Sequence, residues 1–184
     1  TPLGTVNDPL SNRTRVVATY DFTKFREVLA AIHGSRPMQP DGTSKEINIS
    51  TSNKNDEALS EAEVNNFIRE IERDLKSGRL IDWSAIAPLL RIPHNSKQYI
   101  PPVHPHGTHV AGIVGAGLND KKSGRKMLGM CPNIDLYDIR VMDDQGKGEE
   151  FNIIAGLQFI RWMNSQRDGL VIHGVNLSFS MLHE

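Results

Sequence analysis

One stretch constrains the fold of this chain more than any other, the sequence HPHGTHVAGIVGAG at positions 104–117. Three histidines within six residues give way abruptly to a run of small and apolar residues. Ala111, Gly112, Gly115 and Ala116 offer almost no side-chain bulk, although glycine costs up to about 1 kcal/mol relative to alanine inside a helix. Close packing has to compensate for that cost. The stretch therefore predicts a central, buried helix packed against strands or another helix.

The histidines at the start of this helix have three readings. An imidazole in the first turn, as for His106, lies near the positive end of the helix dipole, which disfavours its protonated form and favours a general base. A metal site built from His104, His106 and His109 is the second reading. No Asp, Glu or Cys lies inside the stretch to complete a coordination shell, and Pro105 constrains the first two histidines. The third reading, an ordinary exposed histidine at a helix start, is the favoured one when His106 is taken alone.

The C-terminal half predicts an α/β architecture. NIDLYDIRVM at 133–142 has the pattern of a strand and DDQGKG at 143–148 that of a turn, and residues 149–166 are typical of a helix. GLVIHGVNLSFS at 169–180 then predicts a second strand. Two strands joined by a helix of this length are expected to lie parallel, with a right-handed crossover. The pattern predicts a layered α/β sheet.

The N-terminal half predicts one strand, three helices and a long loop. Ser60 and Glu63 form the pattern of a capping box, and the apolar stripe behind them is expected to pack on its own domain. The expected elements are a strand from Arg15, a short helix at 23–34 that ends at Gly34, a loop at 35–55, a helix from Ser60 to Gly78 and a short helix from about Asp82.

Composition limits the partners and the compartment. The 184 residues carry a formal net charge of −1, so no global field recruits nucleic acid or an anionic membrane. The basic residues Lys121, Lys122, Arg125 and Lys126 are expected in a solvated loop. A single cysteine, Cys131, excludes an internal disulfide and is expected to be a small buried residue. No apolar run approaches the length of a bilayer span.

Three segments resemble one family. HGTHVAG at 106–112 is similar to the active-site histidine motif of the subtilisin-like serine proteases, the subtilases of peptidase family S8. GMCPNIDLYDIRVMDDQGKG at 129–148 and GVNLSFS at 174–180 resemble the family's following segments in the same order. The resemblance implies a three-layer, parallel-sheet, subtilisin-like α/β fold. Residues 1–184 are then part of one peptidase domain, with about 35–100 an inserted loop and helical segment before the histidine helix.

The resemblance also implies the chemistry. His106 matches the base of a Ser-His-Asp triad, and His109 matches a structural histidine. An extended polypeptide substrate would pair with two backbone segments. Ser180 replaces the family's usual glycine, so a side chain there is expected to reshape the specificity pocket. The resemblance settles no cofactor, calcium is the ion that it allows, and an extracellular location is the family expectation. The two substrate-binding segments are Gly146, Lys147 and Gly148, and Ser178, Phe179 and Ser180.

The other two triad members have no match in these 184 residues. No hydrophobic run before His106 ends in D-[ST]-G, and neither Asp8 nor Asp21 fits the triad acid. The letters GTS at 42–44 lie in a polar loop upstream of the base and are taken as coincidence. We therefore expect an incomplete catalytic domain that is inactive alone and that self-associates through uncovered apolar faces. The alternative is a non-catalytic relative that binds extended polypeptide without cutting it.

Overall fold

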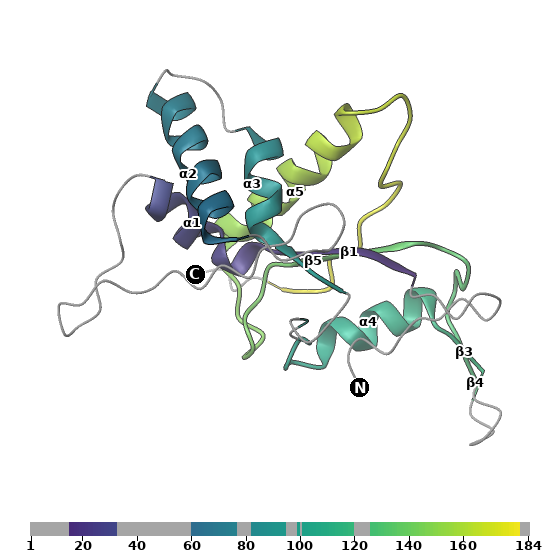
Figure 1. The fold of residues 1–184 in the computed structure, drawn as a ribbon. Coiled ribbons are helices and arrows are strands. Elements are labelled where there is room, and N and C mark those ends of the chain that lie inside the picture. The colour runs from purple at the N-terminus through teal and green to yellow at the C-terminus, as the bar shows by residue number, and fades with distance from the viewer. Residues whose placement is uncertain are drawn as a thin grey trace.

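The protein has an α/β fold in which helices lie on both sides of a small sheet (Figure 1). The computed structural model describes residues 15–32, 60–76, 82–94, 99, 101–119 and 126–180, and everything below concerns those ranges. The predicted loop at 35–55, Gly34, Gly78, Asp8 and the residues at 42–44 and 121–125 lie outside them.

The central sheet has three strands in the order β2-β1-β5 and is mixed. β1 (Val16–Asp21) runs parallel to β5 (Leu136–Arg140), from the pair Val16 and Leu136 to the pair Asp21 and Arg140. β2 (Arg91–Ile92) adds to the other edge of β1 in the antiparallel direction. The strands predicted from Arg15 and at 133–142 are thus confirmed, and they pair with each other. Because β2 is antiparallel, the described residues do not form an all-parallel sheet.

Four helices cover one face of this sheet (Figure 1). The core is a cluster of aromatic and aliphatic side chains from β1, the flanking 3₁₀ turn η1 (Phe22–Lys24) and three of the helices, with Phe22, Ile86 and Phe159 fully buried. Val64, Phe67 and Ile68 pack against it, so the apolar stripe of the second helix does face its own domain. The four are α1 (Phe25–Ile32), α2 (Glu61–Lys76), α3 (Trp83–Leu90) and α5 (Glu150–Ser165).

The capping box at the start of α2 forms as predicted. The carboxylate of Glu63 accepts from the Ser60 amide at 2.8 Å and from its hydroxyl at 2.7 Å, and the Glu63 amide donates back to that hydroxyl. The hydrogen bonds from Ser60 lower the pKa of Glu63 below its usual value. A lowered pKa means that the cap stabilises α2 above the unfolded pKa of about 4.3 and that this contribution disappears as pH falls through the folded pKa.

We expect Glu63→Gln to abolish the loss of α2 stability that occurs as the pH falls. The protection of the amides in the first turn of α2, relative to their intrinsic exchange rates, should fall in the natural chain as pH falls through the folded pKa of Glu63, because the carboxylate that accepts from Ser60 becomes protonated. In the variant that loss of protection should be absent. Exchange rates measured by NMR between pH 3 and 6 provide the check, and an unchanged pH profile would contradict it.

Helix α4 (His106–Gly115) lies alone on the opposite face of the sheet (Figure 1). It begins at His106 as predicted, but the expectation of a central buried helix is wrong for the described residues. Ile113 is half exposed and only Gly115 at the C-terminal end is buried. The small residues instead admit close neighbours at particular points, since a Cβ on Gly112 would lie 3.0 Å from the Met127 methyl group.

A hairpin follows α4 that the sequence did not predict. β3 (Gly117–Asn119) pairs with β4 (Lys126–Leu128), which places Lys126 in a strand instead of a loop. Gly129 then donates to the Ala116 carbonyl at 2.8 Å, and Cys131 donates its amide to the Val114 carbonyl at 2.8 Å. Cys131 is exposed and not the small buried residue expected, because the turn from Gly129 to Pro132 carries it along the outside of α4.

Arg15 joins the sheet to the end of α4. The residue is buried, and its guanidinium donates to the carbonyls of Gly115, Pro132 and Ile134, the last at 3.3 Å. The cation therefore satisfies the Gly115 carbonyl at the negative end of the α4 dipole, together with two carbonyls of the segment that leads into β5.

We expect Arg15→Met to lower the free energy of unfolding by about 2 to 4 kcal/mol, because charge-assisted hydrogen bonds to buried carbonyls would be lost together. Arg26→Met is the matched control, since Arg26 forms an exposed ion pair with Glu149 at 2.6 Å. The control should change stability by less than about 1 kcal/mol. Urea unfolding of both variants distinguishes them, and equal losses would show that burial of Arg15 is unimportant.

Residues 169–180 do not form the predicted strand. They are extended but have no ladder partner among the described residues. Their beginning is anchored by the Asn164 side chain, which accepts from the amides of Val171 and Ile172 and donates to the Ile172 carbonyl, all at 2.8–2.9 Å. The predicted parallel pairing of this segment with β5 is therefore not formed.

Candidate functional site

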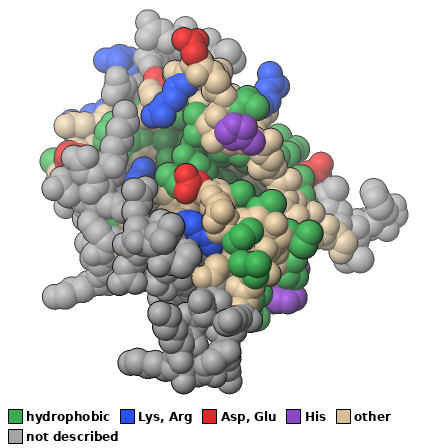
Figure 2. All heavy atoms as spheres, turned by 90° about the vertical axis from the view of Figure 1, so that its right-hand side faces the viewer, with side chains coloured by type: hydrophobic (Ala, Val, Ile, Leu, Met, Phe, Trp, Pro, Cys, Tyr) green, Lys and Arg blue, Asp and Glu red, His purple; other side chains and the backbone are tan. Residues whose placement is uncertain are grey.

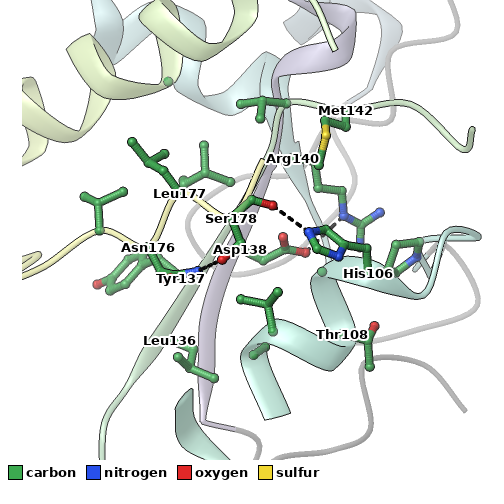
Figure 3. Close-up of a pocket in the computed structure, with 18 of the residues that line it drawn as sticks. His106, Thr108, Leu136, Tyr137, Asp138, Arg140, Met142, Asn176, Leu177 and Ser178 are labelled. Atoms are coloured by element: carbon green, nitrogen blue, oxygen red, sulfur yellow. Dashed lines mark hydrogen bonds and ion pairs between the residues drawn. The ribbon is translucent and has the colours of Figure 1, made fainter. Parts of the chain in front are cut away.

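A cavity of about 1260 Å³ lies between β5, the start of α4 and the extended segment 169–180 (Figure 3). It is lined on one side by the carboxyl end of β5 and by Asp21, the last residue of β1. The predicted site residues that line it are His106, Gly146, Ser178 and Phe179, whereas Lys147, Gly148 and Ser180 do not. Segments far apart in the sequence thus bring most of the predicted site together.

His106 stands at the mouth of this cavity, in the first turn of α4. Its backbone amide donates to Nδ1 of His104 at 3.3 Å, so a side chain two residues earlier partners one of the amides that a helix start leaves open. Pro105 occupies the N-cap position without a side-chain cap. The imidazole lies beside the carboxyl end of the two parallel strands β1 and β5, where α/β folds position reactive groups (Figure 3).

The His106 ring is engaged by the extended segment. Its Nε2 lies 2.6 Å from the backbone carbonyl oxygen of Ser178. A carbonyl oxygen only accepts, so Nε2 must carry the proton in this contact. The lone pair needed to take up a proton is then on Nδ1 or, if the ring is charged, on neither nitrogen. The imidazole in this arrangement is consequently not a base at Nε2.

We expect ¹⁵N NMR at neutral pH to find the His106 ring with Nε2 protonated. The reason is the acceptor at 2.6 Å, which stabilises that tautomer relative to the alternative. His109 serves as the internal reference, because it is exposed and has no such contact among the described side chains. Chemical shifts that place the His106 proton on Nδ1 would contradict the expected tautomer.

The turn after β5 presents one of the predicted peptide-pairing segments. Asp143 organises it, because its carboxylate accepts from the amides of Gln145 and Lys147 at 2.9 Å and its own amide donates to the Lys147 carbonyl at 2.7 Å. Gly146 has a φ of 75°, which favours glycine. A Cβ there would also lie 3.1 Å from Nε2 of His104. Both backbone groups of Lys147 are thus used within the turn.

The second predicted segment is exposed apart from Phe179. Ser178 and Phe179 line the cavity, and Ser180 is an exposed residue beyond it. The Asn176 side chain donates to the Ser178 hydroxyl at 2.8 Å, a contact within the segment itself (Figure 3).

A buried polar network beside the cavity was missed by the sequence analysis. Arg140 pairs with Asp138 at 3.0 Å and donates to the Tyr99 hydroxyl at 3.2 Å. The fully buried Thr19 hydroxyl lies 2.7 Å from Nε2 of His94 and donates to Asp138 at 3.4 Å. Burial raises the pKa of Tyr99, although the Arg140 charge acts in the opposite direction. The alternation of β5, with Asp138 and Arg140 on one face, is the only signal that could have indicated it.

Comparison with known proteins identifies the segment that carries this geometry. The sequence model of the Subtilase family, Peptidase_S8, matches residues 92–179, which include His106 and both sides of the cavity. Residues 92–179 are similar to the subtilases over this range and are called the subtilase segment below. No solved structure gives a significant match to the chain.

Curated relatives match the same family over short stretches. Subtilisin DY of Bacillus licheniformis is 43% identical over 54 residues, which is 29% of this chain and 18% of that protein. The alkaline serine protease ver112 of Corniculantispora psalliotae is 35% identical over 57 residues, 31% of this chain and 13% of that protein. The subtilase-type proteinase RRT12 of Saccharomyces cerevisiae is 38% identical over 55 residues, 30% of this chain and 9% of that protein. The chain thus spans less than a fifth of these relatives.

The subtilase segment offers no metal centre within the described ranges. No three side chains of His, Cys, Asp or Glu converge there, the three histidines at 104, 106 and 109 included. The Asp143 carboxylate in the turn after β5 already accepts from two backbone amides. The described donors therefore do not fit calcium, and no chemistry is derived through it. None of the described helices has the length and apolarity to cross a bilayer.

Proposed function

We propose that this chain is the histidine-bearing part of a subtilisin-like serine endopeptidase, in which His106 acts as the general base. The observation that carries the proposal is the placement of this imidazole at the first turn of α4, on a cavity that Gly146, Ser178 and Phe179 also line. The subtilase match to residues 92–179 supports the same role. We also propose that the complete domain has the three-layer parallel sheet of a subtilisin-like fold.

The base would work through Nε2. A serine hydroxyl attacks the peptide carbonyl, the imidazole takes its proton, and the resulting imidazolium returns the proton to the leaving amine. An aspartate would hold the ring in the reactive tautomer with the proton on Nδ1. Because Nε2 now lies 2.6 Å from the Ser178 carbonyl, the ring has to leave that contact before it can accept a proton. No residue described above matches the serine or the aspartate of the triad, so other residues of the enzyme would supply both.

The substrate would be an extended polypeptide that pairs with the backbone of the two segments beside the cavity. Lys147 uses both of its backbone groups within the turn, and the Gly146 amide donates to the Asp143 carbonyl at 3.0 Å, so the pairing from that side would come from the Gly146 carbonyl and from Gly148. The Ser180 side chain would lie at the specificity pocket, where it would favour smaller substrate side chains than a glycine does. An extracellular location is part of the proposal, supported by a relative named the minor extracellular protease Epr of Bacillus subtilis.

A serine-directed fluorophosphonate tests the enzyme. The reagent is incubated with the longest polypeptide of the source organism that contains these residues. Labelling should be stoichiometric. His106→Gln should abolish it, because the serine is then no longer activated. The 184-residue chain alone should not be labelled. If the full-length polypeptide were not labelled, the proposal of endopeptidase activity would be rejected.

The alternative is a subtilase-like module that binds extended polypeptide without cutting it. The engagement of Nε2 by Ser178 favours it in this conformation, since the imidazole cannot accept a proton there. Saturable binding of unstructured peptides to the full-length polypeptide, without labelling and without cleavage, would establish this module in place of the enzyme.

A further inference from the structure

We propose that His104 is a positioning residue, which links the turn after β5 to the start of α4 and so determines where the His106 ring stands. The His104 side chain is exposed on the wall of the cavity and contacts both elements. That the positioned ring is a general base rests on the proposed function, whereas the link itself rests only on contacts within this chain.

The first contact of His104 is with the backbone of α4. Its Nδ1 accepts from the His106 amide at 3.3 Å, and Pro105 at the N-cap position offers no side chain for the open amides of the first turn. A protonated imidazole carries a hydrogen on both nitrogens and cannot accept, so this contact requires a neutral ring with its proton on Nε2. The contact therefore acts on the backbone of the residue whose ring is positioned.

The same bond, from a side chain to the amide two residues later, occurs elsewhere in the described part of the chain. At Asp21, Asp82 and Asp143 a carboxylate accepts from that amide, at 3.1, 2.8 and 2.9 Å respectively. Asp and Asn have the short side chains that suit such a bond. An imidazole at position 104 is longer than the bond requires. A second contact accounts for the additional length.

The second contact of His104 is with Gly146, in one of the two predicted substrate-binding segments. A Cβ on Gly146 would lie 3.1 Å from Nε2 of His104 and 3.3 Å from both Cδ2 and Cε1, so the far edge of the ring occupies the space of the missing side chain. Asp143 holds this turn closed through the amides of Gln145 and Lys147. The ring thus lies against a fixed turn and sets its distance from the start of α4.

The rings of His104 and His106 do not stack. Their centroids are 6.3 Å apart and their planes are inclined at 64°. His104 consequently acts through the backbone of His106 and leaves Nε2 of that ring to other partners. At present this partner is the Ser178 carbonyl at 2.6 Å. Because a shift at the start of α4 would move Nε2 relative to that carbonyl, the NMR signals of the His106 ring report its position.

Two substitutions in the 184-residue chain separate a simple helix cap from a positioning residue. His104→Ala removes the acceptor, so exchange of the His106 amide should accelerate about fivefold, the equivalent of about 1 kcal/mol for one hydrogen bond. His104→Asn supplies an acceptor for the same amide and should keep its exchange within about twofold of the natural rate. Asparagine does not reach Gly146, so both variants should shift the ¹⁵N signals of the His106 ring. The control, His109→Asn, should change neither reading.

Gly146→Ala tests the link to the turn. In the natural chain the new methyl group has to displace the His104 ring, so the signals of the His106 ring should shift. Alanine at a φ of 75° also strains the turn, but it does so in any background. In the His104→Asn background the imidazole is absent, and Gly146→Ala should then add no further shift at His106. Circular dichroism shows whether each variant folds.

Three results would overturn the proposal. They are unchanged His106 signals in His104→Ala, natural His106 signals in His104→Asn, which would make His104 only a cap, and an effect of Gly146→Ala on His106 that persists without the imidazole.

Fluorophosphonate labelling separates this inference from the proposed function. If the full-length polypeptide is labelled, both substitutions at His104 should slow labelling at least about tenfold, because a small misplacement of a reacting group is costly. Labelling at the natural rate would contradict the positioning role. If the polypeptide is not labelled but the NMR results hold, the endopeptidase is rejected and His104 still positions His106.

Discussion

His106→Gln should reduce kcat for peptide hydrolysis by about 10⁶-fold in the longest polypeptide that contains these residues, with little change in KM. The size is that established for removing the base of a subtilisin triad, which acts as a unit with its serine. Glutamine retains a polar side chain of similar reach, so loss of proton transfer is separated from loss of packing. Cleavage of a chromogenic peptide gives kcat and KM together.

The control for this variant is His109→Gln on the same helix. His109 lies one turn further along, is exposed, and does not line the cavity. It should retain activity within a few-fold. If both substitutions reduced kcat equally, the effect would reflect damage to α4, and if neither did, His106 would not be the base.

Gly129→Ala should destabilise the chain more than any other glycine-to-alanine substitution in the subtilase segment. A Cβ at Gly129 would lie 2.5 Å from the Ala116 amide nitrogen and 2.7 Å from that of Gly115, which are backbone atoms that cannot rotate away. The Gly129 amide also donates to the Ala116 carbonyl at 2.8 Å, so separation of the two segments breaks that bond. We expect a loss of at least about 3 kcal/mol in the free energy of unfolding.

Gly107→Ala is the matched control. It adds the same methyl group within α4, where nothing lies within 4 Å of the new Cβ. Because alanine has the higher helix propensity, this variant should be neutral or more stable by up to about 1 kcal/mol. Urea unfolding of both variants gives the comparison. A loss below about 1 kcal/mol for Gly129→Ala would mean that the chain relaxes at this contact.

Local signals predicted the elements well. The Ser60 and Glu63 capping box and the Asp82 cap act within one turn of backbone, so their pattern is sufficient to start α2 and α3. The position of His106 was predictable for the same reason, because helix α4 begins at a defined boundary in the sequence. The site residues that line the cavity were found only through resemblance, since 72 positions separate His106 from Ser178.

Features that need a distant partner were not predictable. The alternation at 169–180 favours a strand, but a strand exists only when a neighbour accepts its hydrogen bonds, and within the described residues none lies beside it. The small residues of α4 predicted a buried helix, whereas their contacts are local ones with Met127, Gly129 and Ile134. Arg15 reaches carbonyls 100 to 119 positions away, a contact that no local pattern encodes.

The amide and the carbonyl of Lys147 are both bonded to Asp143, so neither is available to a ligand that lies along this turn. A bound peptide backbone can pair there only with the Gly146 carbonyl and with Gly148, because Lys147 has no free amide or carbonyl and the Gly146 amide donates to the Asp143 carbonyl. N-methylation of a bound peptide should therefore be rejected at the residue that donates to the Gly146 carbonyl and tolerated at the residue opposite Lys147.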